Sequence, residues 1–330
     1  MSNNKKCILT IAIPTYNRDW VIDSNLSNLC SFAGKYDCEI LISDNCSTDN
    51  TQYIVKEFQN RFPFVKYVRN SKNLGYDMNV LVAYMACESE YSLLMGDSRT
   101  INEESLKYLM NHLEDNIDAL VFKHTHEETI YHSINDVFLS FGESIIVLGS
   151  FVLKCIMIED KLLDPYIGKF FLHIGLFYEA LNMLENINVK LVNNVNSHFV
   201  VRHKPIGWGK VIFQTHAYGW FYTFMGLPNS IPVELKLSVI KIKYDDPFSV
   251  KTISKRIGHY GPQSKSDFNK YKKLLPLISN TPLWKIKTMV FLPTIFCDFL
   301  HLIYKTYAYL KYKKENKKNL FVYEKENRWI

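Results

Sequence analysis

Ile8-Leu9-Thr10-Ile11-Ala12-Ile13 is an apolar run that ends abruptly in Pro14-Thr15-Tyr16-Asn17-Arg18. A second apolar run, Glu39-Ile40-Leu41-Ile42, passes into Ser43-Asp44-Asn45-Cys46-Ser47-Thr48-Asp49. A buried strand that stops in polar, turn-forming residues places them at the carboxyl edge of a sheet, where open α/β folds bind ligands. An amphipathic helix pattern follows each run. These two units therefore predict one rim that brings together Thr15, Asn17, Arg18, Asp44 and Asp49.

The same alternation of strand and helix patterns continues down the chain. Further strands are predicted at residues 65–68, 91–95, 119–122 and within 189–201, and helical spacing is found at 74–85, 102–113 and 170–184. Asn102 is expected to cap the helix that it opens. Such alternation predicts an α/β fold with a mainly parallel sheet flanked by helices.

The domain organisation follows from where this pattern ends. Glycine and proline interrupt the chain at residues 205–209, so we predict a ligand-binding α/β domain over residues 1–205. Residues 206–330 are predicted to form a helical, basic and aromatic C-terminal extension.

The composition indicates a folded protein with an uneven charge. Of its 330 residues, 47% are hydrophobic, which is enough to bury one large core or two modest ones. Seven cysteines without a Cys-x-x-Cys pair and a polar amino terminus without a secretion signal predict a cytoplasmic protein with reduced thiols. Residues 1–240 carry a net charge of −6 and residues 241–330 one of +12, so the basic character belongs to the C-terminal part.

Four motifs in order carry a family resemblance. They are the Pro14-Thr15-Tyr16-Asn17-Arg18 corner, the Ser43-Asp44-Asn45-Cys46-Ser47-Thr48-Asp49 turn, Arg69-Asn70 followed by Asn73-Leu74-Gly75, and a strand that runs into Gly96-Asp97. Together they resemble the family 2 glycosyltransferases, which have the GT-A fold. The resemblance implies transfer of a sugar from a nucleotide sugar to an acceptor hydroxyl.

The resemblance also implies a donor site along the rim. Its residues would be Pro14, Thr15, Tyr16, Asn17, Arg18, Asp44, Asn73, Gly75 and Asp97. An ionised Asp44 can only accept hydrogen bonds, which suits a base N–H or a ribose hydroxyl. Ser47 and Asp49 are expected to act as turn or helix caps instead. Arg18 is expected either to contact phosphate or simply to begin the helix.

The diphosphate part of this site departs from the family pattern. The family places an Asp-x-Asp cluster here to hold Mg²⁺ or Mn²⁺, whereas this chain has Gly96-Asp97-Ser98-Arg99. Asp97 can still contribute to a hard cation bound with phosphate and water. A guanidinium can also offset phosphate charge, so we expect weakened or absent metal dependence with Arg99 substituting in part.

The family places a general base at the start of a late helix. His173 falls at that position, and its ordinary pKa near 6.5 suits proton abstraction. Glu179 is the second candidate, and the structural alternative for His173 is a satisfied histidine on an apolar helix. His203 and Trp208 follow the last predicted strand and are expected to border the acceptor site.

The C-terminal region suggests a membrane surface. Its most apolar part, residues 288–304, is interrupted by Pro293, Asp298 and His301 and is short for a bilayer span of about 20 residues. Because lysines follow it, we expect an interfacial segment on anionic lipid. The alternative is a helix that packs on the domain, followed by a solvated tail. The basic residues form no recognisable nucleic-acid module, so no nucleic-acid partner is expected.

The sequence therefore predicts an inverting glycosyltransferase at the cytoplasmic face of the cell membrane. It would move a sugar from a nucleotide-sugar donor, first of all a UDP-sugar, to a lipid-linked glycan. The expected pathway is bacterial surface polysaccharide synthesis, meaning capsule, O-antigen or cell-wall glycan. Because the acid after Asp97 is missing, the alternative is a catalytically impaired GT-A domain that binds sugar nucleotides or serves as a scaffold.

Overall fold

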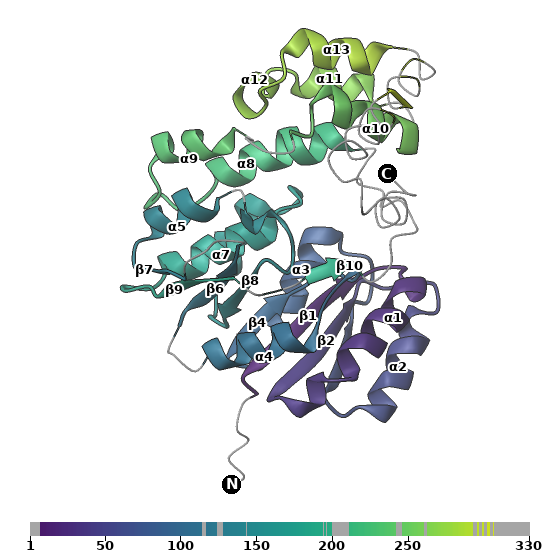
Figure 1. Cartoon of the computed structure of the whole chain (residues 1–330), viewed down its shortest axis with the longest axis vertical. Coiled ribbons are helices and arrows are strands. Elements are labelled where there is room, and N and C mark those ends of the chain that lie inside the picture. The colour runs from purple at the N-terminus through teal and green to yellow at the C-terminus, as the bar shows by residue number, and fades with distance from the viewer. Residues whose placement is uncertain are drawn as a thin grey trace, which may run out of the picture. The chain divides into compact units, whose positions relative to one another are not determined.

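The computed structural model (Figure 1) divides into two compact units. The first holds residues 1–201 and 222–239, and the second holds residues 202–221 and 240–330. The residues that the structure describes are 7–113, 117–123, 128–142, 144–193, 195, 197–199, 211–241, 246–260, 263–292, 296, 299, 302, 303 and 306. Residues 222–239, which the sequence pattern assigned to the C-terminal extension, thus pack with the first unit.

The first unit is built on an eight-stranded sheet with the strand order β3-β2-β1-β4-β8-β6-β9-β7. Its strands are β1 (Leu9–Thr15), β2 (Cys38–Asp44), β3 (Val65–Arg69), β4 (Tyr91–Leu94), β6 (Ala119–Phe122), β7 (Ile130–Tyr131), β8 (Phe151–Lys154) and β9 (Val189–Val192). The pairs β1–β2, β2–β3, β1–β4 and β6–β9 are parallel, which confirms the predicted mainly parallel sheet.

The sequence pattern did not predict the antiparallel strand pairs. Strand β8 lies between β4 and β6 and runs antiparallel to both, and β7 is antiparallel to β9. A separate antiparallel pair joins β5 (Arg99–Ile101) to β10 (Ser197–Phe199). The order and direction in which strands pair depend on contacts between distant residues, which a local sequence pattern does not reveal.

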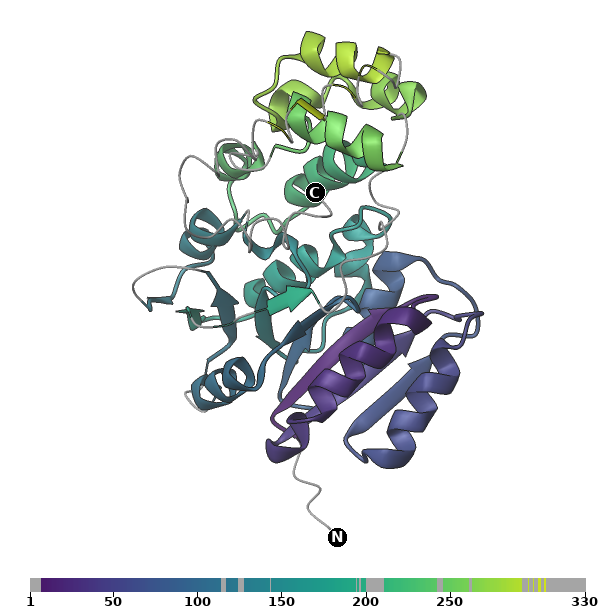
Figure 2. The ribbon, with the colours of Figure 1, turned by 45° about the vertical axis from the view of Figure 1, so that its right-hand side comes forward.

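Helices cover both faces of this sheet. Those of the first unit are α1 (Asp19–Cys30), α2 (Thr51–Arg61), α3 (Tyr76–Met85), α4 (Glu103–His112), α5 (Ile134–Phe141), α6 (Asp160–Leu163), α7 (Leu172–Asn182) and most of α9 (Val233–Ile240). Figure 2 shows α1 and α2 side by side over β1 and β2. Helix α3 packs on β1, β2 and α7. Asn102 caps α4 as predicted, because its side chain accepts a hydrogen bond from the Ser105 N–H.

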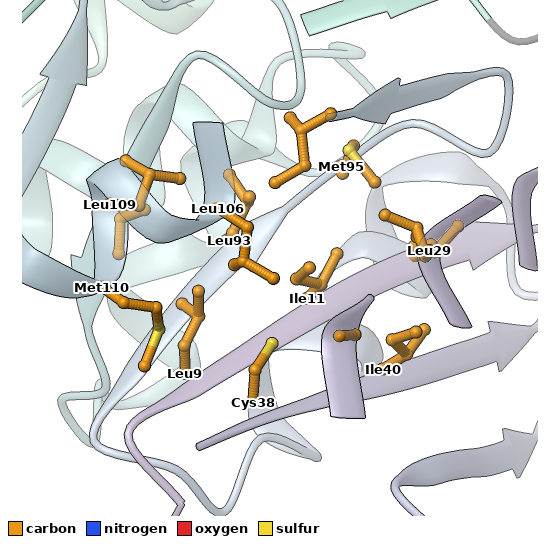
Figure 3. Close-up of a cluster of buried hydrophobic side chains, with 14 of the residues drawn as sticks. Leu9, Ile11, Leu29, Cys38, Ile40, Leu93, Met95, Leu106, Leu109 and Met110 are labelled. Atoms are coloured by element: carbon orange, nitrogen blue, oxygen red, sulfur yellow. The ribbon is translucent and has the colours of Figure 1, made fainter. Parts of the chain in front are cut away.

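The main hydrophobic core lies between the sheet and the helices α1, α2 and α4. Alternate residues of β1, Leu9, Ile11 and Ile13, point into it. Figure 3 shows Ile11 gathered with Leu29 of α1 and Leu106 of α4 on this face. Because β1 is buried along its whole length, only its carboxyl end leaves side chains for a ligand.

The second unit is helical in the part of it that the structure describes. After a π-helical segment (Phe213–Gly219) it contains α10 (Val250–Tyr260), α11 (Lys265–Tyr271), α12 (Leu275–Ile278) and α13 (Leu283–Phe291), and α8 (Trp220–Met225) begins in it. Phe213 packs on Phe248 and Phe268, with ring centroids 5.6 and 5.7 Å apart. The predicted helical extension is therefore confirmed. Within the described residues, no helix combines the length and apolar character needed to span a bilayer.

Candidate functional site

The rim is defined here as the carboxyl ends of β1, β2 and β4 together with the turns that follow β1, β2, β3 and β4. The parallel register of the sheet assembles it. Thr15 pairs with Asp44 at the ends of β1 and β2, and the Asn45 N–H donates to the Thr15 carbonyl over 3.0 Å. The two following turns are also bonded together. Asn17, with a φ of 52°, accepts the Thr48 N–H on its Oδ1 (2.8 Å) and donates its own N–H to Ser47 Oγ (2.9 Å).

Asp44 joins the turn after β2 to two residues of β3. Its side chain is 0% exposed. Oδ1 accepts the Ser47 N–H at 2.8 Å, and Oδ2 accepts the Tyr67 hydroxyl at 2.6 Å and lies 3.3 Å from Arg69 Nε. Burial raises the pKa of Tyr67, and its bond to Asp44 raises it further. Asp44 therefore shapes the rim through Ser47, and its contact with a donor stays a prediction.

Side-chain amides fix the loop that completes the rim. Asn45 Nδ2 donates to Asn73 Oδ1 (2.9 Å) and to the Gly75 carbonyl (3.1 Å), and Asn45 Oδ1 accepts the Leu74 N–H (2.8 Å). Gly75 has a φ of 86°, which a residue with a Cβ rarely adopts. Asn79 of α3 donates to the carbonyls of both Thr15 and Ser43. The predicted donor site did not include Asn45 or Asn79, because their hydrogen bonds join distant parts of the chain and leave no local signal.

The predicted capping roles are confirmed in part. Asp49 Oδ1 accepts the Thr51 N–H at the start of α2, and its Oδ2 accepts the Asp19 N–H at the start of α1, each over 3.0 Å. One carboxylate thus satisfies donors in the first turns of two helices. Pro14 is buried in β1, and Tyr16 is exposed beside the corner.

Asp97 lies at the rim, three residues after the end of β4. Its Oδ2 accepts the Thr15 hydroxyl over 3.2 Å and lies 3.5 Å from Arg18 Nε. The Arg18 and Asp97 side chains are 24% and 16% exposed, so solvent reaches both. Burial raises the pKa of the Asp97 carboxyl, while Arg18 and Thr15 oppose that shift. The structure thus brings together Thr15, Arg18 and Asp97, as the sequence predicted.

The residues beside Asp97 do not suit a metal ion held by the protein. Magnesium and manganese prefer several oxygen ligands, and Asp97 offers one carboxylate whose Oδ2 already faces a hydroxyl and a guanidinium. In the part of the chain that is described, no group of three or more His, Cys, Asp or Glu side chains could hold a metal. Metal dependence stays a prediction to be tested.

Arg99 lies on β5, three residues after Gly96. Its N–H donates to the Gly96 carbonyl (2.9 Å), and Asn25 of α1 donates to the carbonyls of Asp97 (2.8 Å) and Arg99 (2.9 Å). These bonds hold the turn after β4 against α1. Burial lowers the pKa of the Arg99 guanidinium. A role for it at the diphosphate stays a prediction.

His173 is buried in the first turn of α7, with only 2% of the residue exposed. Its Nε2 lies 2.8 Å from the Ile146 carbonyl. A carbonyl oxygen can only accept, so Nε2 carries the proton and Nδ1 keeps the lone pair. Nδ1 has no hydrogen-bond partner among the described residues. Burial lowers the pKa of His173 to about 4, although the carbonyls of Ile146 and Ile145 raise it. The ring is therefore neutral at physiological pH.

Asp77 connects the start of α7, where His173 lies, to the loop after β3. The sequence analysis did not identify Asp77 as a site residue. Asp77 lies in the first turn of α3, two residues after Gly75, and is buried. Its carboxylate accepts the N–H groups of Phe170 (2.9 Å) and Leu172 (3.4 Å) at the start of α7. Burial raises the pKa of Asp77, and these N–H groups oppose the shift. Phe170 has a φ of 70°, which marks the turn that Asp77 holds.

Glu179, the second candidate base, lies in a buried network further along α7. Its Oε1 accepts the Tyr166 hydroxyl at 2.7 Å, and the Tyr166 ring fills the space beside Gly175, where a Cβ would come within 2.3 Å of it. Burial raises the pKa of Glu179, while Tyr166 and Lys236 lower it. These contacts give Glu179 a packing role, and a catalytic one stays a prediction. His203 and Trp208 lie outside the described residues.

Comparison with known proteins agrees with this architecture. A mixed, mostly parallel sheet with a polar rim at the ends of β1, β2 and β4 is the arrangement of a GT-A domain. The S. aureus TarS crystal structure aligns over 86% of this chain and 53% of its own, with a TM-score of 0.51 and 14% identity, a likeness in fold alone. The family model described as glycosyl transferase family 2 matches residues 10–136 of this chain.

Two curated relatives match the same region. The abequosyltransferase RfbV of Salmonella typhimurium is 33% identical over 113 residues, which are 34% of this chain and 34% of that protein. A chondroitin synthase of Escherichia coli is 32% identical over 136 residues, which are 40% of this chain and 19% of that protein. The chain thus spans about a third or less of the length of these relatives.

Proposed function

We propose that this chain is a glycosyltransferase that takes its sugar from a nucleotide-sugar donor bound at the rim. The observation that carries the proposal is the convergence of Thr15 of β1, Arg18 of the turn after β1 and Asp97 of the turn after β4, in a region that matches the family 2 model. Arg18 supplies positive charge where a diphosphate needs it, and the turns after β1 and β2 supply polar groups for the nucleoside. A UDP-sugar is the first donor to test.

The proposed reaction is a single inverting displacement with His173 as the general base. The Ile146 carbonyl holds the imidazole in the tautomer whose Nδ1 can accept a proton. Asp77 fixes the start of α7, so it would position His173 relative to the rim. Because His173 is buried, its imidazole is a weak base, and an acceptor hydroxyl would reach Nδ1 only after the residues that cover the ring had moved.

A thermal-shift screen with UDP, GDP and dTDP and their sugars tests the proposal. A ligand that binds only the folded state raises the Tm, by an amount that corresponds to about 2.7 kcal/mol at 100 times its Kd. We expect one nucleoside diphosphate to stabilise the chain, and its sugar to be consumed when an acceptor extract is added. Adenosine diphosphate is the control ligand. No shift with any of the three would contradict the proposal, and binding without sugar release would favour the impaired alternative.

We further propose that the acceptor is a lipid-linked glycan of a bacterial surface polysaccharide and that the second unit contacts the cytoplasmic face of the membrane. The relatives' names, an abequosyltransferase and a chondroitin synthase, support a glycan acceptor. Trp284 of α13 is 65% exposed, and Leu283 and Phe291 on the same helix are also exposed. The Lys285 ammonium lies 5.5 Å from the centre of the Trp284 ring, and residues 241–330 carry a net charge of +12. Aromatic and cationic groups together suit an anionic lipid surface.

Liposome flotation tests this surface. The full chain is expected to float with vesicles of anionic phospholipid at low salt and to be released at high salt, since the attraction is screened. Trp284→Ala should weaken flotation, whereas Tyr53→Ala, an equally exposed aromatic residue on α2, should not. Equal flotation with neutral vesicles, or none with either kind, would count against a membrane role.

A further inference from the structure

We propose that Arg18 bridges Asp97 and the donor diphosphate, in the place where a divalent cation would otherwise link them. Donor binding is then independent of metal. This inference rests on the proposed function and names the group that recognises the diphosphate. It assigns the role to Arg18, directly before α1, and not to Arg99, which the sequence pattern favoured.

The position of Arg18 is fixed from several sides. Its N–H donates to Thr51 Oγ1 over 3.2 Å, and its carbonyl accepts the N–H groups of Val21 and Ile22 in the first turn of α1. Its guanidinium lies 5.6 Å from the centre of the Trp20 ring and 3.5 Å from Asp97 Oδ2. Less conformational freedom is therefore lost when this side chain meets a ligand.

The charges at Asp97 favour a guanidinium over a dication. The positive charge of Arg18 compensates the negative charge of the Asp97 carboxylate. A divalent cation bound at the same Oδ2 would therefore be repelled by the Arg18 guanidinium. A guanidinium has five N–H donors, and the contact between Nε and Asp97 does not exhaust them. Its planar fork matches phosphate oxygens, which are often bound in a bidentate manner. Asp97 then orients Arg18, and Thr15 holds Asp97 in turn.

Titration calorimetry with the full chain tests this assignment. The probe is the nucleoside diphosphate that binds among UDP, GDP and dTDP, and the parent nucleoside is the control ligand. We expect the Kd of the diphosphate to change less than about twofold between excess EDTA and added Mn²⁺. Arg18→Ala should weaken diphosphate binding roughly 10- to 100-fold and leave nucleoside binding nearly unchanged, because charge-assisted bonds to phosphate are lost.

Two variants keep the test decisive. Arg99→Ala removes the same charge from the start of β5 and should change the Kd by less than about threefold. Arg18→Lys keeps the charge without the fork, preserves the fold if Arg18→Ala does not, and should give intermediate binding. Binding that requires Mn²⁺ and is indifferent to Arg18 would overturn this inference alone. If no nucleoside or nucleoside diphosphate binds the parent chain, the proposed function itself fails.

Discussion

Replacing Asp44 with alanine should lower the free energy of unfolding by about 2–3 kcal/mol and abolish donor binding. The change leaves the Arg69 guanidinium, the Tyr67 hydroxyl and the Ser47 N–H without their shared acceptor. Breaking a fully buried ion pair costs about 3–5 kcal/mol. The Arg69 side chain is 32% exposed, so water compensates part of that loss. Ser47 would also no longer hold the Asn17 corner.

Denaturant unfolding of matched variants measures this effect. Asp23→Ala, which removes an exposed carboxylate from α1, should change the free energy of unfolding by less than about 0.5 kcal/mol. Asp44→Asn keeps an acceptor without the charge and should fall between Asp44→Ala and the parent chain. If Asp44→Ala were as stable as Asp23→Ala, the proposed anchoring role of Asp44 would be wrong.

Acidification should destabilise the protein through His173. The folded state keeps this imidazole neutral down to a pKa of about 4, whereas the unfolded chain protonates it near 6.5. Between these values the unfolded state binds the extra proton, so stability is complete above pH 6.5 and falls as the pH drops toward 4. The loss from this one group is on the order of 3 kcal/mol.

The variant His173→Gln isolates this contribution. Glutamine can still donate an N–H to the Ile146 carbonyl but does not titrate, so its stability should fall less steeply between pH 6.5 and 4. His216, whose pKa burial lowers to about 3, is present in both proteins and cancels in the comparison. Parallel pH profiles would contradict the buried, neutral assignment. A normal transfer rate in His173→Gln, with donor binding unchanged, would rule His173 out as the base.

The opening strands and the turns after them could be predicted from sequence because their signals are local. The runs that became β1 and β2 are mostly apolar and end in turn-forming residues, and Asn102 stands directly before the helix that it caps. The parallel register then follows from the α/β alternation, and it places Thr15 beside Asp44.

The rest of the site depends on contacts between distant parts of the chain, which leave no local signal. Arg18 and Asp97 are joined only once β1 and β4 pair, and the same pattern was compatible with Arg99 as the cation. Asp77 meets Phe170 across 93 positions in the sequence. The insertion of β8 between β4 and β6 likewise rests on pairing that four residues cannot reveal.

The most direct test is a crystal structure of the chain with the nucleoside diphosphate that binds it. We expect the diphosphate to lie within hydrogen-bonding distance of the Arg18 guanidinium, and the nucleoside to lie against the turns that follow β1 and β2. A nucleotide bound elsewhere on the molecule, with the Thr15, Arg18 and Asp97 cluster untouched, would contradict it.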